Sequence, residues 1–242
     1  MSRTLRRVEL TPGYLLHHRP WRDTSRILEV LTREHGRLTL FARGVRAPRA
    51  RLGAVLQPFQ PLLVSWSGRS EAPLLTGAER AGHAAPLPPR SLLAAFYLNE
   101  LLLRLTTHHD PFPALYDHYQ DALAELRTGT PAASCLRMFE KRLLELLGYG
   151  LDLATEAHTG RPVEPGGYYH FHPGEGLVRA RSREPRSLPG RSLLALERGT
   201  LRDARELGDA RRVLRAALEG CLEGRPLATR IVAKAMLRKA AP

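Results

Sequence analysis

Five short strand-like segments, separated by turns, fill the first 80 residues of the chain. In the third segment Leu38, Leu40 and Ala42 fall on one side of an extended strand and polar residues mostly on the other. Short strands at such close spacing favour a small closed barrel or a sandwich. The five segments are residues 8–18, with a bend near Pro12-Gly13, and residues 26–32, 36–43, 58–66 and 74–80.

An arginine-rich loop follows the third segment. Gly44 and Pro48 cannot continue the strand. The loop contains no acidic residue, and its cations are Arg43, Arg46, Arg49 and Arg51. A mobile loop of this composition is suited to gripping a polyphosphate, but it is also typical of a solvated turn, and the residues alone leave both readings open.

The net charge of the chain favours a polyanionic partner. There are 37 Lys and Arg against 24 Asp and Glu, a formal charge of +13, and residues 1–82 alone carry 14 arginines and six acids. No apolar run approaches the roughly 20 residues of a membrane span, and the basic residues 1–7 lack the apolar core of a secretory signal. We therefore expect a cytoplasmic nucleic-acid-binding protein. A basic five-stranded barrel is the form of an OB-fold, whose strands and loops bind single strands.

Helical patterns dominate the chain after the proline-rich stretch 84–89. The segment from Ser91, the expected N-cap, to Thr106 is apolar on most sides, as a central buried helix is. Asn99 and Glu100 interrupt it, and we expect them to meet the backbone of a neighbouring loop rather than to act in catalysis. Further helices are predicted over residues 112–127, 132–147, 191–206, 208–222 and 227–239.

The combined pattern predicts an α+β protein. An OB-fold domain is expected over residues 1–83, and a helical domain over 84–150 and 186–242. Residues 151–185 are rich in Gly, Pro and Arg, with one strand-like piece at 168–171, and predict a small, irregular and partly mobile lobe.

Two of the expected helices carry basic residues of interest. In 132–147, Leu136 and Leu144 belong to an apolar stripe beside Arg137 and Lys141. An arginine at the edge of an apolar groove can hold a partner's carboxylate, or it can pair with a local glutamate. The last helix either contacts phosphates or places its cations to suit the helix dipole; these cations are Arg230, Lys234 and Arg238.

Signatures of catalysis are absent from the sequence. There is no phosphate-binding loop, no Gly-x-Ser-x-Gly and no His-Glu-x-x-His, and the acids are too scattered for a two-metal nuclease. We expect neither an enzyme nor a cofactor. The histidine groups are more typical of exposed side chains than of a metal site; they are His158, His170 and His172, and His108 and His109 with Asp110. Cys135 and Cys221 are expected to be reduced core residues.

Several segments resemble, in order, the RecO family of bacterial recombination mediators. They are His18–Ser25, Gly36–Arg46, Leu56–Phe59, Tyr97–Leu102, Leu136–Glu140 and Leu147–Gly150. The resemblance implies an OB-fold, a helical domain and a lobe that binds zinc through four cysteines in many members. Residues 151–185 contain no cysteine, and Glu156 to Thr159 stand where a cysteine pair would lie. We therefore expect no zinc and a lobe held by packing alone.

The resemblance also implies a function and partners. Members bind single- and double-stranded DNA, anneal complementary strands and act with RecR to load RecA onto strands covered by single-strand-binding protein, with RecF as a further candidate partner at the nucleoid. The acidic tail of single-strand-binding protein would bind the helical domain, where Arg137 matches the family's carboxylate-binding arginine, with Lys141, Leu136 and Leu144 around it. The DNA-binding residues we predict are Arg37, Arg43, Arg46, Arg49, Arg51, Phe41, Arg230, Lys234 and Arg238. An RNA-binding OB protein and a metal-dependent nuclease are the alternatives.

Overall fold

The computed structural model describes residues 7–47 and 50–240. The chain forms two compact units, one of Met1–Gly129 with Leu227–Pro242 and the other of Thr130–Pro226. These units do not have the boundaries expected from the sequence, near residues 83, 150 and 186. The division into an OB-fold domain, a helical domain and a lobe therefore stays a prediction.

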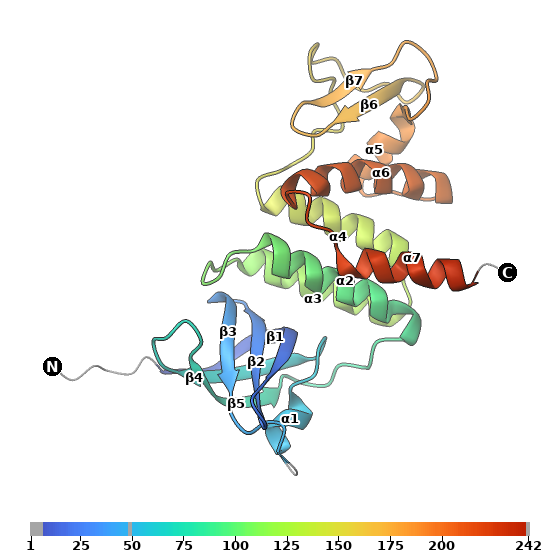
Figure 1. The fold of residues 1–242 in the computed structure, drawn as a ribbon. Coiled ribbons are helices and arrows are strands. Elements are labelled where there is room, and N and C mark those ends of the chain that lie inside the picture. The colour runs from blue at the N-terminus through green and yellow to red at the C-terminus, as the bar shows by residue number, and fades with distance from the viewer. Residues whose placement is uncertain (1–6, 48–49, 241–242) are drawn as a thin grey trace. The chain divides into compact units, whose positions relative to one another are not determined.

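Five strands of the first unit close into a barrel (Figure 1). The strand order is β1-β2-β3-β5-β4, with β4 returning to pair with β1, and only the β3–β5 contact is parallel. The predicted five-stranded OB barrel is confirmed. The strands are β1 (Arg7–Trp21), β2 (Ser25–Thr32), β3 (Gly36–Ala42), β4 (Pro61–Ser67) and β5 (Leu74–Arg80), with the short helix α1 (Arg51–Val55) between β3 and β4.

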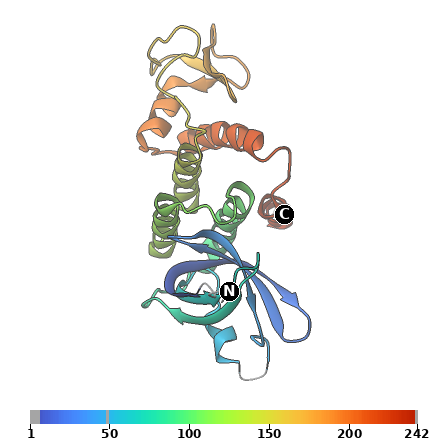
Figure 2. The same ribbon diagram turned by 90° about the vertical axis from the view of Figure 1, so that its left-hand side faces the viewer.

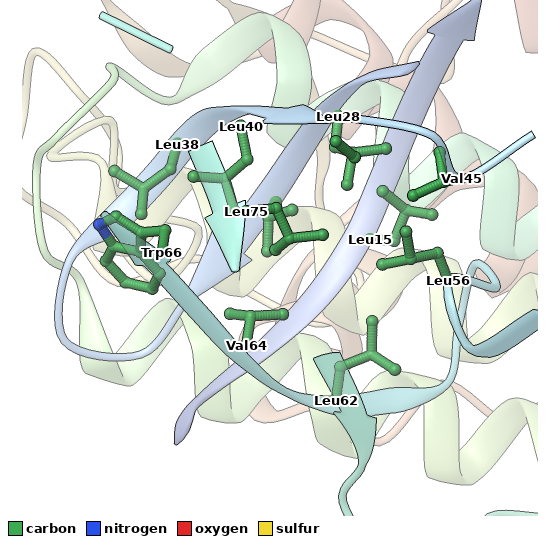
Figure 3. Packing of buried hydrophobic residues seen from close by; sticks show 12 residues of the cluster. Leu15, Leu28, Leu38, Leu40, Val45, Leu56, Leu62, Val64, Trp66 and Leu75 are labelled. Carbon is green, nitrogen blue, oxygen red and sulfur yellow. The ribbon is translucent and has the colours of Figure 1, made fainter. Parts of the chain in front are cut away.

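The inside of the barrel is filled by aliphatic side chains from all five strands (Figure 3). Leu38, Leu40 and Ala42 of β3 point inward as the alternation predicts, and none is more than 3% exposed. Trp66 of β4 packs against these side chains and is 5% exposed. Burying one such leucine stabilises the fold by about 1.5–3 kcal/mol, so this cluster is the main source of barrel stability.

Three helices complete the first unit. They are α2 (Pro89–Leu105), α3 (Pro113–Thr128) and α7 (Ala228–Ala240). The prediction that Ser91 caps α2 is wrong, because the helix starts at Pro89, whose fixed φ suits a first helical position. Ser91 instead lies inside the helix, where its buried hydroxyl donates to the Leu126 carbonyl at 3.1 Å.

Buried polar contacts join the barrel to α2 and α3. The Asn99 amide donates to the Leu16 carbonyl of β1 at 2.8 Å and accepts from the Tyr119 hydroxyl of α3 at 2.6 Å. On the surface, Arg33 forms a two-point ion pair with Asp117, with both distances 2.9 Å. Asn99 thus contacts neighbouring backbone as predicted, but that backbone belongs to strand β1 and not to a loop.

Glu100 fixes the start of α7 beside α2 (Figure 2). Its carboxylate accepts from the Ala228 and Thr229 amides at 2.7 and 2.9 Å and from the Thr229 hydroxyl at 2.6 Å. Burial raises the pKa of Glu100, but these hydrogen bonds outweigh it and lower the pKa overall. Glu100 therefore acts as the N-terminal cap of a helix that lies 128 residues further along the chain.

The second unit contains three helices and a small sheet. The predicted helix 191–206 is too long, because Gly199 adopts φ +69° and ends it. A new helix then starts behind Asp203, whose carboxylate accepts from the Glu206 amide at 2.8 Å. The elements are α4 (Ala132–Leu146), β6 (Tyr168–His172), β7 (Gly176–Arg179), β8 (Leu188–Pro189), α5 (Gly190–Arg198) and α6 (Ala204–Cys221).

The lobe around β6 is held by more than packing, which corrects the expectation from its composition. The nearly buried Glu156 accepts from the Thr159 hydroxyl at 2.7 Å, so the two residues at the place of a cysteine pair bind each other directly. Arg179 pairs with Glu164 at 2.6 Å and approaches Glu156 at 3.5 Å. Strands β7-β6-β8 of the same lobe form a three-stranded sheet, and Arg179 is the last residue of β7.

Candidate nucleic-acid interface

The arginine loop after β3 is anchored at its base. Gly44 turns the chain with φ +70°, and Val45 then enters the barrel core at 4% exposure. The Arg46 amide donates to the Thr24 carbonyl at 2.8 Å. The expectation of a mobile loop is therefore wrong for residues 44–47, which are fixed by a buried side chain and a backbone hydrogen bond.

The far side of the loop is anchored as well. A Cβ on Gly53 would lie 2.1 Å from the Val45 carbonyl, so glycine is required for this close approach. Leu56, just after α1, returns to the core at 1% exposure. Arg43, Arg46 and Arg51 are exposed. Arg49 lies outside the described residues.

The loop lies beside the tip of the β1–β2 hairpin, at the end of the barrel away from α2 and α3 (Figures 1 and 2). The Arg46 side chain donates to the Arg22 carbonyl at 3.4 Å. Arg43 and Arg51 form no hydrogen bond or ion pair within the described part of the chain. We name this surface the arginine rim, formed by Arg19, Arg22, Arg43, Arg46 and Arg51. The only acid within residues 19–26 or 43–51 is Asp23.

Arg37 does not belong to this surface. It is 8% exposed, and its guanidinium donates to Glu29 at 2.9 Å and to the Thr106 carbonyl at 2.7 Å. The segment after α2 crosses β3 here, and the His109 amide donates a hydrogen bond to the Arg37 carbonyl at 2.9 Å. Its predicted role in DNA contact therefore needs correction, because the guanidinium joins the barrel to the helices.

The exposed aromatic residue near the rim is Trp21 rather than the predicted Phe41. Phe41 is half-buried where β3 meets β5, and its amide donates to the Pro73 carbonyl at 2.9 Å. Trp21 ends β1 and is 40% exposed, with the Arg19 guanidinium 5.5 Å from its ring centre. Sequence reasoning missed Trp21, although a tryptophan between two arginines in a turn is a readable signal.

The three predicted cations of α7 differ in accessibility. Arg230 is half-buried, lies 5.6 Å from the centre of the Tyr97 ring and donates to the Tyr97 hydroxyl at 3.1 Å. Lys234 and Arg238 are exposed. The same helix exposes Ile231 and Met236, at 60% and 59%. Lys234 and Arg238 thus remain available to an anionic partner, whereas Arg230 helps to hold the helix.

In the second unit, Arg137 forms a buried ion pair with Glu140 at 2.7 Å. This is the local pairing that the sequence left open as an alternative. The Arg137 Nε has no hydrogen-bond partner among the described residues. Lys141 pairs with Glu145 at 2.5 Å. Of the two predicted apolar neighbours, Leu136 is half-buried, and Leu144 is fully buried and out of reach of a partner in this conformation.

Three of the histidines in the two groups pair with carboxylates. His158 lies 2.7 Å from Glu175, and His108 lies 3.0 Å from Glu29. His170 donates to Glu184 at 3.0 Å, and this hydrogen bond is the main cause of the lowered pKa of Glu184. Within residues 7–47 and 50–240 no three His, Cys, Asp or Glu side chains converge as metal ligands. Neither Cys135 nor Cys221 forms a disulfide; Cys135 is buried and Cys221 is half-buried.

Comparison with known proteins assigns the chain to a family. The model described as Recombination protein O N terminal matches residues 6–81, and that described as Recombination protein O C terminal matches residues 86–231. The chain belongs to the RecO family. The resemblance read from the sequence is confirmed, and the RecO family is a DNA repair family.

Curated relatives carry the name DNA repair protein RecO. The relative from Nitrosococcus oceani is 46% identical over 226 residues, which are 93% of this chain and 92% of the relative. The relative from Ralstonia nicotianae is 42% identical over 95% of this chain and 85% of its own length. The relative from Coxiella burnetii is 42% identical over 93% of this chain and 97% of its own length. Among the described residues of this RecO family member, no helix is long and apolar enough to cross a membrane.

Proposed function

We propose that the chain is a non-enzymatic mediator that binds single- and double-stranded DNA and anneals complementary strands in the cytoplasm, at the nucleoid. The arginine rim is the observation that carries this proposal. It places five arginines at one end of the barrel with a single acid among them, and two of them, Arg43 and Arg51, form no hydrogen bond or ion pair with the residues that the structure describes. Such cations are suited to phosphate contacts, which position a strand without reading its sequence.

Annealing follows from the same cations. Two complementary strands repel each other through their phosphates, and a surface that neutralises both lowers that repulsion. The bases supply the pairing energy, so the chain needs no catalytic group. Lys234 and Arg238 on α7 provide a second set of exposed cations for this purpose.

We further propose that α4 binds the acidic tail of single-strand-binding protein around Arg137, and that RecR, with RecF as a further partner, joins the complex that loads RecA. The unsatisfied Nε of Arg137 supports a carboxylate ligand. Glu140 already holds the other side of the guanidinium, so the arriving carboxylate must share or displace that contact.

The test compares two triple variants that remove the same charge. Arg43→Ala/Arg46→Ala/Arg51→Ala removes the rim cations. The control replaces Arg142, Arg215 and Arg225, which are already paired with glutamates at 3.1, 2.7 and 2.6 Å. We expect the rim variant to bind and anneal labelled strands at least about ten-fold less well and the control to resemble the wild type.

Equal losses in both variants would show that net charge, not the rim, governs binding. Equal wild-type affinity for RNA and DNA, with no binding of the tail peptide, would favour the RNA-binding alternative. Cleavage of DNA with magnesium or manganese would favour the nuclease.

A further inference from the structure

Trp21 is the exposed aromatic residue at the DNA-facing end proposed for the barrel. It is the last residue of β1, paired with Ser25 across the hairpin, and 40% of its surface is accessible. The second tryptophan, Trp66, is 5% exposed in the barrel core. Single exposed aromatic residues are common on proteins, so the surroundings of Trp21 must carry the argument.

Those surroundings are cationic on both sides. Arg19 precedes Trp21 by two residues on the same face of the strand, and its guanidinium lies 5.5 Å from the ring centre. Arg22 follows, and its carbonyl accepts from the Arg46 side chain at 3.4 Å. The indole ring therefore lies within the arginine rim, next to groups suited to hold phosphates.

An aromatic ring beside phosphate-binding cations discriminates between forms of DNA. In a duplex the faces of the bases are covered by stacking, so the rim meets only the backbone. In a single strand the bases are free to stack on a protein ring, and each such contact strengthens binding without regard to sequence.

We propose that Trp21 is a stacking platform for an unpaired base and gives the barrel its preference for single strands over duplex. This inference rests on the proposed DNA binding by the arginine rim and adds a residue that determines selectivity. A base stacked on Trp21 leaves when it pairs, so the same residue favours release of the annealed product.

The first experiment uses tryptophan fluorescence of the wild-type chain. Because Trp66 is enclosed in the core, a change on binding reports Trp21. We expect a 20-nucleotide deoxythymidine strand to quench the emission. A strand of 20 abasic sites, which has the same phosphates and no bases, should bind without the same quenching. Equal quenching by the two strands would overturn the proposal without the need for any variant.

The second experiment measures affinities of Trp21→Ala and Trp21→Phe. We expect Trp21→Ala to bind the deoxythymidine strand about 5- to 160-fold more weakly, the range for loss of one stacked base, and to bind the abasic strand and a duplex within about two-fold of the wild type. Trp21→Phe keeps an aromatic ring, so it should retain part of the affinity for the deoxythymidine strand that Trp21→Ala loses. Leu10→Ala is the matched control, since Leu10 is on the same strand and 52% exposed.

The outcomes separate the two proposals. Unchanged affinity of Trp21→Ala for the deoxythymidine strand, or equal losses on all three ligands, would overturn the stacking role and leave the arginine rim in place. Failure of the wild-type chain to bind any of the three would instead contradict the proposed function itself.

Discussion

The buried pair of Arg137 and Glu140 has consequences for stability that any test of the tail site must take into account. Their side chains are 9% and 2% exposed, so each neutralises the other away from water. Arg137→Ala leaves the Glu140 carboxylate uncompensated, and we expect a loss of about 3–5 kcal/mol in the free energy of unfolding of the second unit. Adding Glu140→Gln removes the stranded charge and should restore part of that loss.

The assay must observe the second unit directly. Both tryptophans lie in the barrel, so fluorescence does not report on α4. We would follow urea unfolding by circular dichroism and measure hydrogen exchange of the amides in residues 132–146, which reports on α4 itself. Arg142→Ala is the control, because Arg142 is 53% exposed and its pair with Glu145 should contribute less than about 1 kcal/mol.

The folded double variant then serves the binding test. We expect Arg137→Ala/Glu140→Gln to lose affinity for a tail peptide with a free terminal carboxylate and to keep its affinity for naked DNA. A double variant as unstable as the sum of the two single variants would refute the argument for a coupled buried pair. A stable double variant that binds the peptide like the wild type would refute the assignment of Arg137 to the tail.

Two further predictions concern the first unit. Asn99→Ala leaves the Leu16 carbonyl and the Tyr119 hydroxyl without their buried partner, so we expect it to lower the free energy of unfolding in urea by about 2–5 kcal/mol. Tyr119→Phe should then destabilise the Asn99→Ala variant less than it destabilises the wild type. Additive losses from the two substitutions would contradict a shared hydrogen bond. Glu100→Ala should cost about 1 kcal/mol locally and speed hydrogen exchange at the start of α7, whereas Glu125→Ala, at an exposed position of α3, should not. Because the pKa of Glu100 in the folded state is lowered from 4.5, the stabilisation of α7 by this cap should be complete above about pH 4.5. It should be lost as the pH falls through the lowered pKa of the folded state. Hydrogen exchange in α7 that does not change with pH over this range, after correction for intrinsic exchange rates, would count against the cap.

Local patterns in the sequence predicted the five barrel strands, most of the helices and the inner face of the barrel, but not α1, β7 or β8. The alternation of Leu38, Leu40 and Ala42 depends only on the two-residue period of a strand, so it was readable without the rest of the fold. The end of α5 at Gly199 is also a local signal, because glycine readily adopts the positive φ found at the end of a helix. Such features depend on a few neighbouring residues.

The parts of the site that escaped prediction depend on distant segments. Arg37 is covered by residues 106–109, and nothing near Arg37 in the sequence announces that crossing. Val45 lies in the arginine loop of the sequence, yet its side chain is buried in the barrel core, and Gly53 lets the chain approach its carbonyl. Glu100 caps a helix 128 residues away. Periodicity cannot show such contacts, because it describes only residues that are close in sequence.

The salt dependence of DNA binding reports how many phosphates the arginine rim holds. Each phosphate contact contributes about 0.7 to the slope of log affinity against log salt for a single strand. If Arg43, Arg46 and Arg51 each hold a phosphate, replacing all three with alanine should reduce the slope by about 2, while the control that replaces Arg142, Arg215 and Arg225 keeps the wild-type slope. An unchanged slope in the rim variant would contradict the account, because it would mean that the arginine rim releases no counterions and does not hold the DNA.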